Sequence, residues 1–213
     1  MIARVIRPFV FTSIMVTLWI VPSDEDSAKL QRIMAIRPNP SASSSESYPN
    51  FYPHITLAAP LSSSPLTLDQ IRESISKYLP HSPISIKFKS VDTGSVFFRS
   101  VYIVIEPSSE LISLHEHIHT SLSLEPRTPL YPHLSLCYIT DKDECERARW
   151  RQLLEDTGRI RNHSMAGVEM NCAVEGGKDD WLGSFVAHEI WLVNCVGPVE
   201  EWSILDKVRL DDR

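Results

Sequence analysis

Two nearly identical phrases, YPHITLAAP at residues 52–60 and YPHLSLCYI at residues 131–139, decide how this sequence folds. Each phrase runs Tyr-Pro-His, then an aliphatic residue, a hydroxyl residue and a leucine. This alternation of polar and apolar positions predicts a β-strand. The two copies are too far apart for a local turn, and their separation fits two related halves of one domain.

The two predicted strands present the same chemistry. Residues two apart in a strand point to the same face, so His54 and Thr56 project together, as do His133 and Ser135. Aliphatic residues between them anchor the opposite face. The proline before each histidine removes a backbone donor, which places each histidine near the start or the edge of its strand.

The rest of the chain surrounds these strands with a mixture of helices and strands. Predicted helices cover residues 23–36, 67–79, 109–123 and 141–156, and further predicted strands cover residues 14–22, 84–94, 100–107, 165–174, 185–194 and 201–208. Each half repeats the order strand, helix, strand with the histidine phrase. This order predicts an α+β fold with two similar lobes, formed by one domain over residues 1–213.

The helix ends carry capping signals. Ser23 followed by acidic residues predicts an N-terminus, and Thr67 with Gln70 forms a capping box. Asp141 with Glu144 predicts the start of the helix that runs to about residue 156.

Composition narrows the class of protein. The chain has 213 residues, 43% hydrophobic and 23% charged, which is ordinary for a globular domain. The net charge of −6 argues against a passive nucleic-acid binder, which normally carries a basic face, but it leaves a small anionic substrate open. The four cysteines show no CxxC pair and no zinc-like spacing, so we expect free thiols.

The N-terminus reads MIARVIRPFVFTSIMVTLWIVP, with two early arginines and a mostly apolar run. A signal or transit peptide looks similar, but no small-residue cleavage site follows. Proline, serine and threonine interrupt the run, and a membrane-spanning helix needs about 20 apolar residues, so we expect no span. Our interpretation is a disordered leader over residues 1–13 followed by a buried strand.

Two imidazoles and two hydroxyls facing one cleft suit chemistry at a phosphoryl group. Imidazole titrates near pH 6.5, so one ring can take a proton from water while the other protonates a leaving oxygen. The hydroxyls can donate hydrogen bonds to the non-bridging oxygens. This set of groups needs no metal and no cofactor.

The doubled His-x-Thr/Ser motif resembles the 2H phosphoesterase superfamily, and within it the fungal and plant cyclic phosphodiesterases. VTLWIVPSDEDS at 16–27, with Trp19 at an aromatic position, is similar to that family's opening strand. Tyr138 in HLSLCY matches a family tyrosine, and VEEWSILDKVRL at 199–210 is similar to its closing strand. The resemblance runs from about Thr17 to Leu210.

The resemblance implies a bilobal α+β fold, with antiparallel sheets lining a central cleft and helices outside. It implies His54 and His133 as the acid–base pair and Thr56 and Ser135 as phosphate ligands. It also suggests that Trp19 and Tyr138 flank the nucleoside or help to hold the phosphate.

The reactions it implies open two kinds of cyclic phosphate. These are 2′,3′-cyclic nucleotides, opened to 2′-phosphates, and ADP-ribose 1″,2″-cyclic phosphate, opened to ADP-ribose 1″-phosphate. A role in clearing the cyclic phosphate left by tRNA splicing follows from the resemblance alone. The sequence leaves open which histidine is the acid. We expect a monomer that acts on a small cyclic phosphate, with no long nucleic acid as partner, in the cytoplasm or associated with the Golgi.

Two rival functions stay open. One is an RNA-end-processing 2H enzyme, either 2′-5′ RNA ligase-like or an exonuclease, which a basic track beside the cleft would favour. The other is a nucleotide- or RNA-binding module without turnover, against which both intact motifs speak.

HEHIH at 115–119 matches a zinc-protease motif. It has no evident third ligand, so we interpret His115 and His119 as solvated neighbours of a core stripe. The stripe consists of Leu111, Leu114, Ile118 and Leu122. The tryptophans at 181, 191 and 202 read as core or surface residues rather than as ligand platforms.

Overall fold

The computed structural model describes residues 15–38, 44–59, 66–78, 83–125, 131–163 and 167–210. The predicted leader over residues 1–13 therefore lies outside the described residues. None of the helices within these ranges is both long enough and apolar enough to cross a membrane.

The described elements alternate between strands and helices along the chain. The helices are α1 (Asp24–Met34), α2 (Leu68–Tyr78), α3 (Ser109–Ser121) and α4 (Cys145–Asp156), with short 3-10 turns at Asp141–Asp143 and Val199–Glu201. The strands are β1 (Val16–Val21), β2 (Ile55–Ala58), β3 (Ile84–Val96), β4 (Arg99–Ile105), β5 (His133–Cys137), β6 (Ile160–His163), β7 (Gly167–Asn171), β8 (Trp181–Leu182), β9 (Ser184–Ala187), β10 (Glu189–Asn194) and β11 (Ser203–Arg209).

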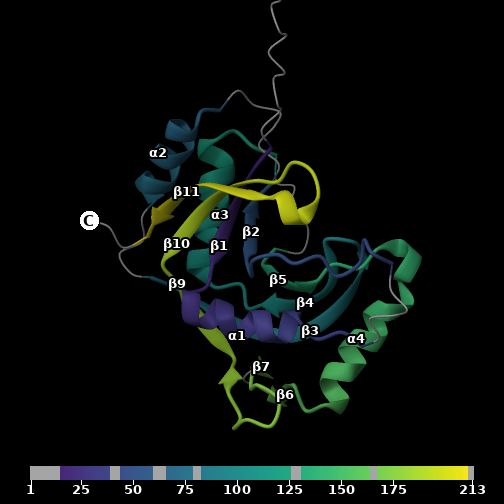
Figure 1. Cartoon of the computed structure of the whole chain (residues 1–213). Coiled ribbons are helices and arrows are strands. Elements are labelled where there is room, and N and C mark those ends of the chain that lie inside the picture. The colour runs from purple at the N-terminus through teal and green to yellow at the C-terminus, as the bar shows by residue number, and fades with distance from the viewer. Residues whose placement is uncertain are drawn as a thin grey trace, which may run out of the picture.

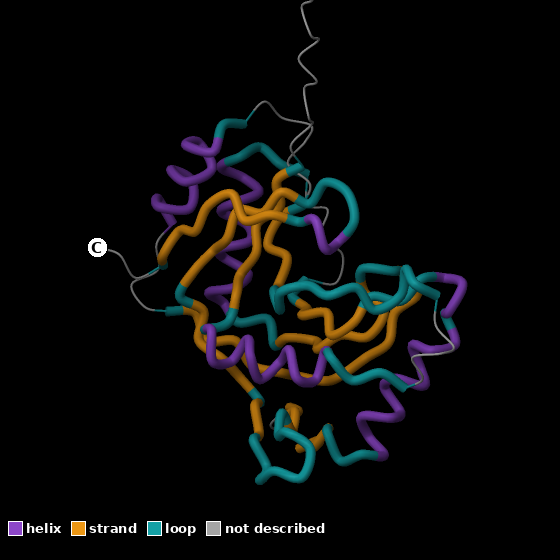
Figure 2. Tube along the Cα trace, viewed as in Figure 1, coloured by secondary structure: helices purple, strands orange, loops and turns teal. Residues whose placement is uncertain are grey.

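One eight-stranded sheet, with every neighbouring pair antiparallel, organises the molecule. Its order is β11-β10-β1-β2-β5-β4-β3-β9. The motif strands β2 and β5 are neighbours at its centre, with four strands in each half. Figures 1 and 2 show the two halves curling away from this join, with α2 and α3 on one side and α1 and α4 on the other. The predicted α+β fold with two lobes is therefore confirmed.

The alternation in the motifs explains why the strands bury one face. Ile55, Leu57, Leu134 and Leu136 are fully buried in the main core. Full burial of such a side chain stabilises the fold by about 1.5–3 kcal/mol relative to exposure. The residues between them, His54, Thr56, His133 and Ser135, face the opposite surface of the sheet. Their side chains are therefore not needed for the main core and can line a site.

The halves repeat the same local order. β1–α1–β2 forms one unit and β4–α3–β5 the other, and each ends in a motif strand. Each helix packs across the join: α1 contacts β5, and α3 contacts β2. This exchange ties the two motif strands to each other through both helices.

Two of the three predicted caps are confirmed. The Ser23 hydroxyl accepts from the Asp26 backbone N–H at 3.1 Å, and Gln70 and Thr67 bond reciprocally at 2.8 and 3.2 Å. The predicted cap at Asp141 is wrong. The Asp141 carboxylate forms an ion pair with Arg147 at 2.6 Å, and residue 141 begins a 3-10 turn that precedes α4.

The C-terminal third differs from the prediction in two ways. The strand expected over 185–194 is split into β9 and β10, which lie in opposite halves of the main sheet: β9 pairs with β3, and β10 pairs with β1. A separate three-stranded sheet, β6-β7-β8, forms below the main sheet. Residues 175–180 belong to the connection that joins β7 to β8, which pair antiparallel.

Candidate active site

The pairing of β2 with β5 sets the geometry of the site. Ile55 lies opposite Leu134 in an antiparallel ladder. Continuing that register places His54 beside Ser135, and Thr56 beside His133. Each histidine therefore has the hydroxyl of the other motif as its cross-strand neighbour, an arrangement with local two-fold character.

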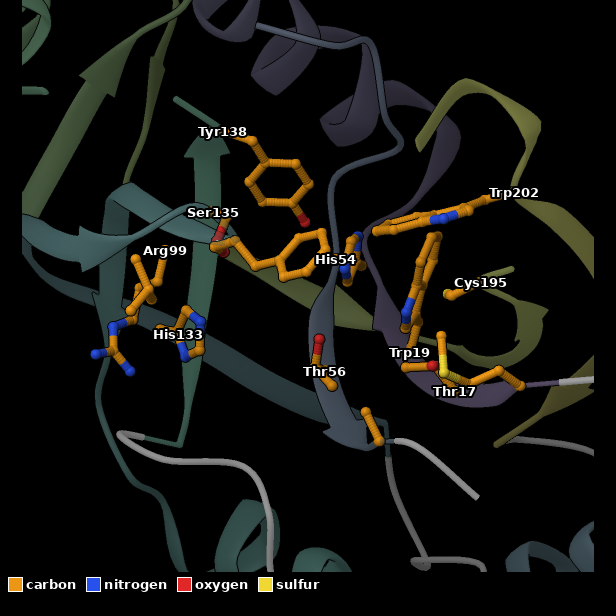
Figure 3. Close-up of a pocket in the computed structure, with 14 residues that line it drawn as sticks. Thr17, Trp19, His54, Thr56, Arg99, His133, Ser135, Tyr138, Cys195 and Trp202 are labelled. Atoms are coloured by element: carbon orange, nitrogen blue, oxygen red, sulfur yellow. The ribbon is translucent and has the colours of Figure 1, made fainter. Parts of the chain in front are cut away.

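These side chains line one pocket of about 420 Å³ at the join of the lobes (Figure 3). All six residues singled out from the sequence reach this pocket. Its full lining is Met15, Thr17, Trp19, His54, Thr56, Ala59, Val96, Phe98, Arg99, His133, Ser135, Tyr138, Cys195 and Trp202. The structure thus brings the predicted residues together, while their roles stay predictions.

His54 is held tightly. The side chain is only 6% exposed, and its ring stacks on Trp19 at 3.6 Å with an interplanar angle of 7°. Its Nδ1 lies 2.6 Å from the Tyr52 carbonyl oxygen, so Nδ1 carries the proton and donates it. The Nε2 atom is then left as a proton acceptor.

The surroundings of His54 oppose its protonation. The pKa of His54 is lowered from 6.5 to about 4, chiefly by burial; the hydrogen bond to Tyr52 opposes this shift, and the neighbouring His133 adds to it. The ring is therefore neutral at pH 7. A neutral imidazole with an available Nε2 is suited to act as a general base.

His133 and the hydroxyls complete the centre of the pocket. The His133 ring meets Tyr102 edge-on at 5.4 Å, and both His133 and Thr56 are partly exposed. The Ser135 hydroxyl is buried and donates to the Phe98 carbonyl oxygen at 2.8 Å. A phosphate oxygen that binds Ser135 therefore competes with this carbonyl for the hydroxyl proton.

Tyr138 closes one wall of the pocket. Its ring is buried and stacks on Phe51 at 3.9 Å with an interplanar angle of 5°. Figure 3 shows its hydroxyl directed toward the middle of the pocket. Burial raises the pKa of Tyr138, so the phenol stays protonated and can donate a hydrogen bond.

Three of the lining residues that sequence reasoning did not single out shape the pocket most clearly. Trp202, interpreted from the sequence as core or surface, lies on the pocket wall, tilted against Trp19 at 5.8 Å. Phe98 is 56% exposed at the pocket although it is a large apolar residue. Phe97 and Phe98 lie between two predicted strands, where turns usually carry glycine, proline or polar residues. Two phenylalanines in such a turn were the signal that could have indicated a functional role. Nothing in the sequence pointed to Arg99.

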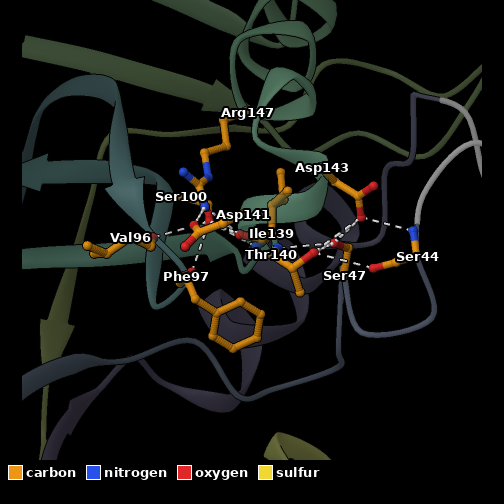
Figure 4. Close-up of polar contacts among 10 residues, drawn as sticks. All are labelled: Ser44, Ser47, Val96, Phe97, Ser100, Ile139, Thr140, Asp141, Asp143 and Arg147. Carbon is orange, nitrogen blue, oxygen red and sulfur yellow. Dashed lines mark hydrogen bonds and ion pairs between the residues drawn. The ribbon is translucent and has the colours of Figure 1, made fainter.

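A buried polar cluster fixes the β3–β4 turn that carries Phe98 (Figure 4). The hydroxyl of the fully buried Ser100 accepts from the Ile139 N–H at 2.8 Å and lies 2.9 Å from the Phe97 carbonyl oxygen. Arg147 donates to the Ile139 carbonyl oxygen at 2.8 Å. The turn is thereby fastened to the chain that leaves β5.

A second set of contacts fastens the segment before the first motif. The Asp143 carboxylate accepts from the Ser47 hydroxyl at 2.6 Å and from the Ser44 N–H at 2.9 Å, and these bonds lower the pKa of Asp143 (Figure 4). The Thr140 N–H donates to the Ser47 hydroxyl at 3.1 Å. This segment leads into the residues that stack on Tyr138.

The interpretation of His115 and His119 as solvated residues needs correction. The histidines of HEHIH are not both solvated: His119 is 6% exposed, and the rings of His115 and His119 lie 4.0 Å apart. The core stripe beside them is confirmed. Within the described residues, no group of three or more His, Cys, Asp or Glu side chains is placed to hold a metal ion.

In a regular strand Cys137 would point to the same face as His133 and Ser135, toward the cleft. It is instead buried and lines a different cavity, since the ladder between β4 and β5 shifts its register at Val101. All four cysteines of the chain are free thiols.

Comparison with known proteins decides the family. A family model described as "Cyclic phosphodiesterase-like protein" matches residues 14–210. The chain belongs to this family. The resemblance inferred from the doubled motif is therefore confirmed, and the family boundaries enclose both motif strands.

Two relatives of the cyclic phosphodiesterase-like chain are named as enzymes. It is 27% identical over 130 residues to a cyclic phosphodiesterase of Arabidopsis thaliana, covering 60% of this chain and 67% of the relative. It is also 27% identical, over an aligned length of 230 residues, to a 2′,3′-cyclic-nucleotide 3′-phosphodiesterase of Yarrowia lipolytica. That match covers 89% of this chain and 96% of the relative.

Solved structures share the fold at low sequence identity. Escherichia coli LigT complexed with NADP+ has a TM-score of 0.54 and 15% identity, over 93% of this chain and 99% of that one. A protein of Thermus thermophilus has a TM-score of 0.53 and 13% identity, over 92% and 98%. These likenesses establish the architecture alone.

Proposed function

We propose that this protein hydrolyses 2′,3′-cyclic nucleotides to nucleoside 2′-phosphates. The single observation that carries the proposal is the pocket at the join of β2 and β5, where two imidazoles and two hydroxyls converge. The names of the Arabidopsis and Yarrowia relatives support the same reaction class. ADP-ribose 1″,2″-cyclic phosphate, which presents the same strained diester, is a second proposed substrate.

The surroundings of the two histidines suggest their roles. His54 is buried, neutral and has its Nε2 available, so we assign it as the base that takes a proton from the attacking water. The water oxygen bonds to phosphorus as the bond to the ribose 3′ oxygen breaks. His133 supplies a proton to that departing oxygen, which leaves the phosphate on the 2′ oxygen.

The remaining polar groups fit the non-bridging oxygens. Thr56 and Ser135 reach the pocket from neighbouring strands, and Tyr138 offers a protonated hydroxyl. Donors fixed in place before the reaction stabilise the charge that gathers on phosphoryl oxygens. On binding, the Ser135 hydroxyl gives up its hydrogen bond to the Phe98 carbonyl oxygen and donates to a phosphate oxygen instead.

The apolar wall fits a nucleobase. Trp19, Phe98 and Trp202 line the pocket, and aromatic faces stack on bases without strong sequence preference.

The structure weighs against the RNA-end-processing rival. A longer RNA would need a basic track that follows its backbone. Among the described residues that line the pocket there is a single lysine or arginine, and the chain carries a net charge of −6. A small ligand fits this charge balance better.

The experiment is a comparison of kcat/KM for 2′,3′-cyclic AMP between the natural protein and the variants His54→Ala and His133→Ala. Each should lose about 10²–10⁴-fold while circular dichroism shows an unchanged fold. His163→Ala is the matched control, because His163 lies outside the pocket and contacts Glu169. Near-full activity in either pocket variant would refute the mechanism, and failure to turn over any cyclic phosphate would leave the binding-module rival.

A further inference from the structure

Tyr48 has an unusual backbone conformation. Its φ angle is +62°, in the left-handed region that residues with a side chain rarely adopt. It precedes Pro49, and a residue before proline normally favours an extended backbone. Among the described residues, the other non-glycine residue with a positive φ is Ser123, which follows the end of α3, where this conformation is common. Tyr48 is not at a helix end, so its surroundings must hold it in this conformation.

Tyr48 is held from several sides. Its backbone N–H donates to the Tyr138 carbonyl oxygen at 2.7 Å, and its own carbonyl oxygen accepts from the Arg37 guanidinium at 3.2 Å. The same guanidinium lies over the Tyr48 ring, with its central carbon 4.8 Å from the ring centre. The preceding residue, Ser47, is fixed by the hydrogen bond from its hydroxyl to Asp143 (Figure 4). Arg37 thus contacts both the backbone and the ring of Tyr48.

Arg37 joins the strained residue to the end of α1. Its guanidinium also donates to the carbonyl oxygens of Met34 and Ile36, at 2.5 and 2.9 Å. The side chain is half-buried, and the cost of removing the cation from water lowers the pKa of Arg37. This cation therefore gives its donors to the backbone of two segments, the end of α1 and the stretch that leads into the first motif.

The residues that follow Tyr48 contact two members of the proposed machinery. Phe51 stacks on Tyr138 at 3.9 Å with an interplanar angle of 5°, and it meets His54 edge-on at 6.1 Å. The Tyr52 carbonyl oxygen lies 2.6 Å from Nδ1 of His54. The conformation of Tyr48 sets the direction in which the chain continues to these residues. A change at Tyr48 would therefore move the carbonyl that selects the tautomer of His54.

We propose that Arg37 is a positioning residue for the proposed reaction. It keeps Tyr48 in the left-handed conformation and thereby places the Tyr52 carbonyl against His54. Arg37 lines a separate cavity of about 270 Å³, which has no lining residue in common with the pocket, so it acts through Tyr48 and not on the substrate. This inference rests on the proposed function, because the residue that it orients is the proposed base.

Nitrogen-15 NMR of the histidine rings tests this role without turnover, with His54→Gln to assign the signals. The natural protein at pH 7 should show His54 with its proton on Nδ1 alone. Arg37→Met removes the donors but keeps an apolar stem, and it should give a mixture of the two tautomers. A single tautomer in the folded Arg37→Met variant, or a mixture in the natural protein, would overturn the inference.

Arg32→Met is the matched control. Arg32 lies in the last turn of the same helix and also donates to a backbone carbonyl oxygen, that of Cys172, at 2.6 Å. Its partner lies outside the segment that leads to His54, so the control should keep the single tautomer. A mixture in both variants would show a general effect of loosening α1 and would overturn the specific role of Arg37.

Kinetics gives a second readout. Arg37→Met should lower kcat for 2′,3′-cyclic AMP by about 10- to 100-fold and change KM by less than about 3-fold, because a misplacement of about 1 Å can cost about 10²-fold in rate. Arg32→Met should keep the kcat of the natural protein. An unchanged kcat in Arg37→Met would overturn the inference. If the natural protein hydrolysed no cyclic phosphate, the proposed function would fail, and the tautomer measurement would still decide the role of Arg37.

A double variant tests whether Arg37 acts through the backbone of Tyr48. Glycine adopts a positive φ without a steric penalty, so Tyr48→Gly removes the need for Arg37. In that background Arg37→Met should leave the tautomer of His54 unchanged and lower kcat by less than about 3-fold, a strong departure from additivity. The same losses in both backgrounds would overturn the inference. Circular dichroism checks the fold of each variant, and the single variants decide the question if Tyr48→Gly does not fold.

Discussion

The acid side of the pH–rate profile offers a sharp test of the environment of His54. If His54 is the base, kcat/KM falls only when the ring becomes protonated in the free enzyme. The structure buries the ring against Trp19 and lowers its pKa from 6.5 to about 4. A lowered pKa moves the acid limb to lower pH, so activity should persist well below pH 6.5.

The size of the effect follows from the two pKa values. At pH 5.5 a histidine with a pKa of about 4 is about 97% neutral, whereas one with a pKa of 6.5 is only about 9% neutral. The enzyme should therefore keep nearly all of its kcat/KM at pH 5.5, instead of about a tenth. Removing the stacked ring with Trp19→Ala admits water to His54, which should move the limb upward toward 6.5.

The assay is kcat/KM for 2′,3′-cyclic AMP between pH 3.5 and 9, with NMR titration of the histidine ring protons on the same samples. Far-ultraviolet circular dichroism identifies any loss of activity that comes from unfolding. An acid limb centred at or above pH 6 in the folded natural protein would refute the assignment of His54 as a neutral, buried base.

Other predictions concern stability and the second wall of the pocket. Ser100→Ala leaves the Ile139 N–H without its acceptor and should lower the free energy of unfolding by about 1–3 kcal/mol in urea, with the exposed Ser184→Ala as an unaffected control. A similar loss in both variants would contradict the role of the buried cluster. Leu57→Ala empties a fully buried position and should cost about 2–5 kcal/mol in the same assay; a loss under 1 kcal/mol would show that the site is not packed as described. Between pH 6.5 and 4 the unfolded chain binds a proton at His54 that the folded chain does not, so the free energy of unfolding should fall by up to about 3 kcal/mol as the pH drops. His54→Gln should remove most of that fall, and an unchanged pH dependence would argue against a lowered pKa. Tyr138→Phe removes a proposed phosphate donor and should lower kcat by about 10-fold or more without unfolding, whereas unchanged kcat would exclude the contact.

The two central strands of the fold could be predicted from the sequence because polar and apolar residues alternate strictly in the doubled phrase. Ile55 and Leu134 must face a core if His54 and His133 are to share a surface, and the structure pairs those two aliphatic residues directly. The caps at Ser23 and Thr67 were equally legible, since each depends on residues three apart. Patterns among residues close together in the sequence therefore predicted the motif strands and most of the helices correctly.

Features that depend on contacts between residues far apart in the sequence could not be predicted. Trp202 and Arg99 reach the pocket only because β11 and β4 stand at particular places in the sheet order. Cys137 does not line the pocket, because the register between β4 and β5 shifts beside it. The sequence of the second motif gives no sign of this shift. Asp141 was predicted to cap a helix, but its carboxylate forms an ion pair with Arg147 of α4 instead. The monomeric state and the compartment stay predictions.

The measurement closest to the central claim is phosphorus NMR of the product from 2′,3′-cyclic AMP in the presence of EDTA. Two histidines in one pocket, acting on a substrate held in one orientation, should open one of the two P–O bonds of the ring. The account predicts turnover to 2′-AMP alone, at the same rate with or without the chelator. A mixture with 3′-AMP, or loss of activity in EDTA that added metal restores, would contradict a two-histidine mechanism in the pocket between β2 and β5.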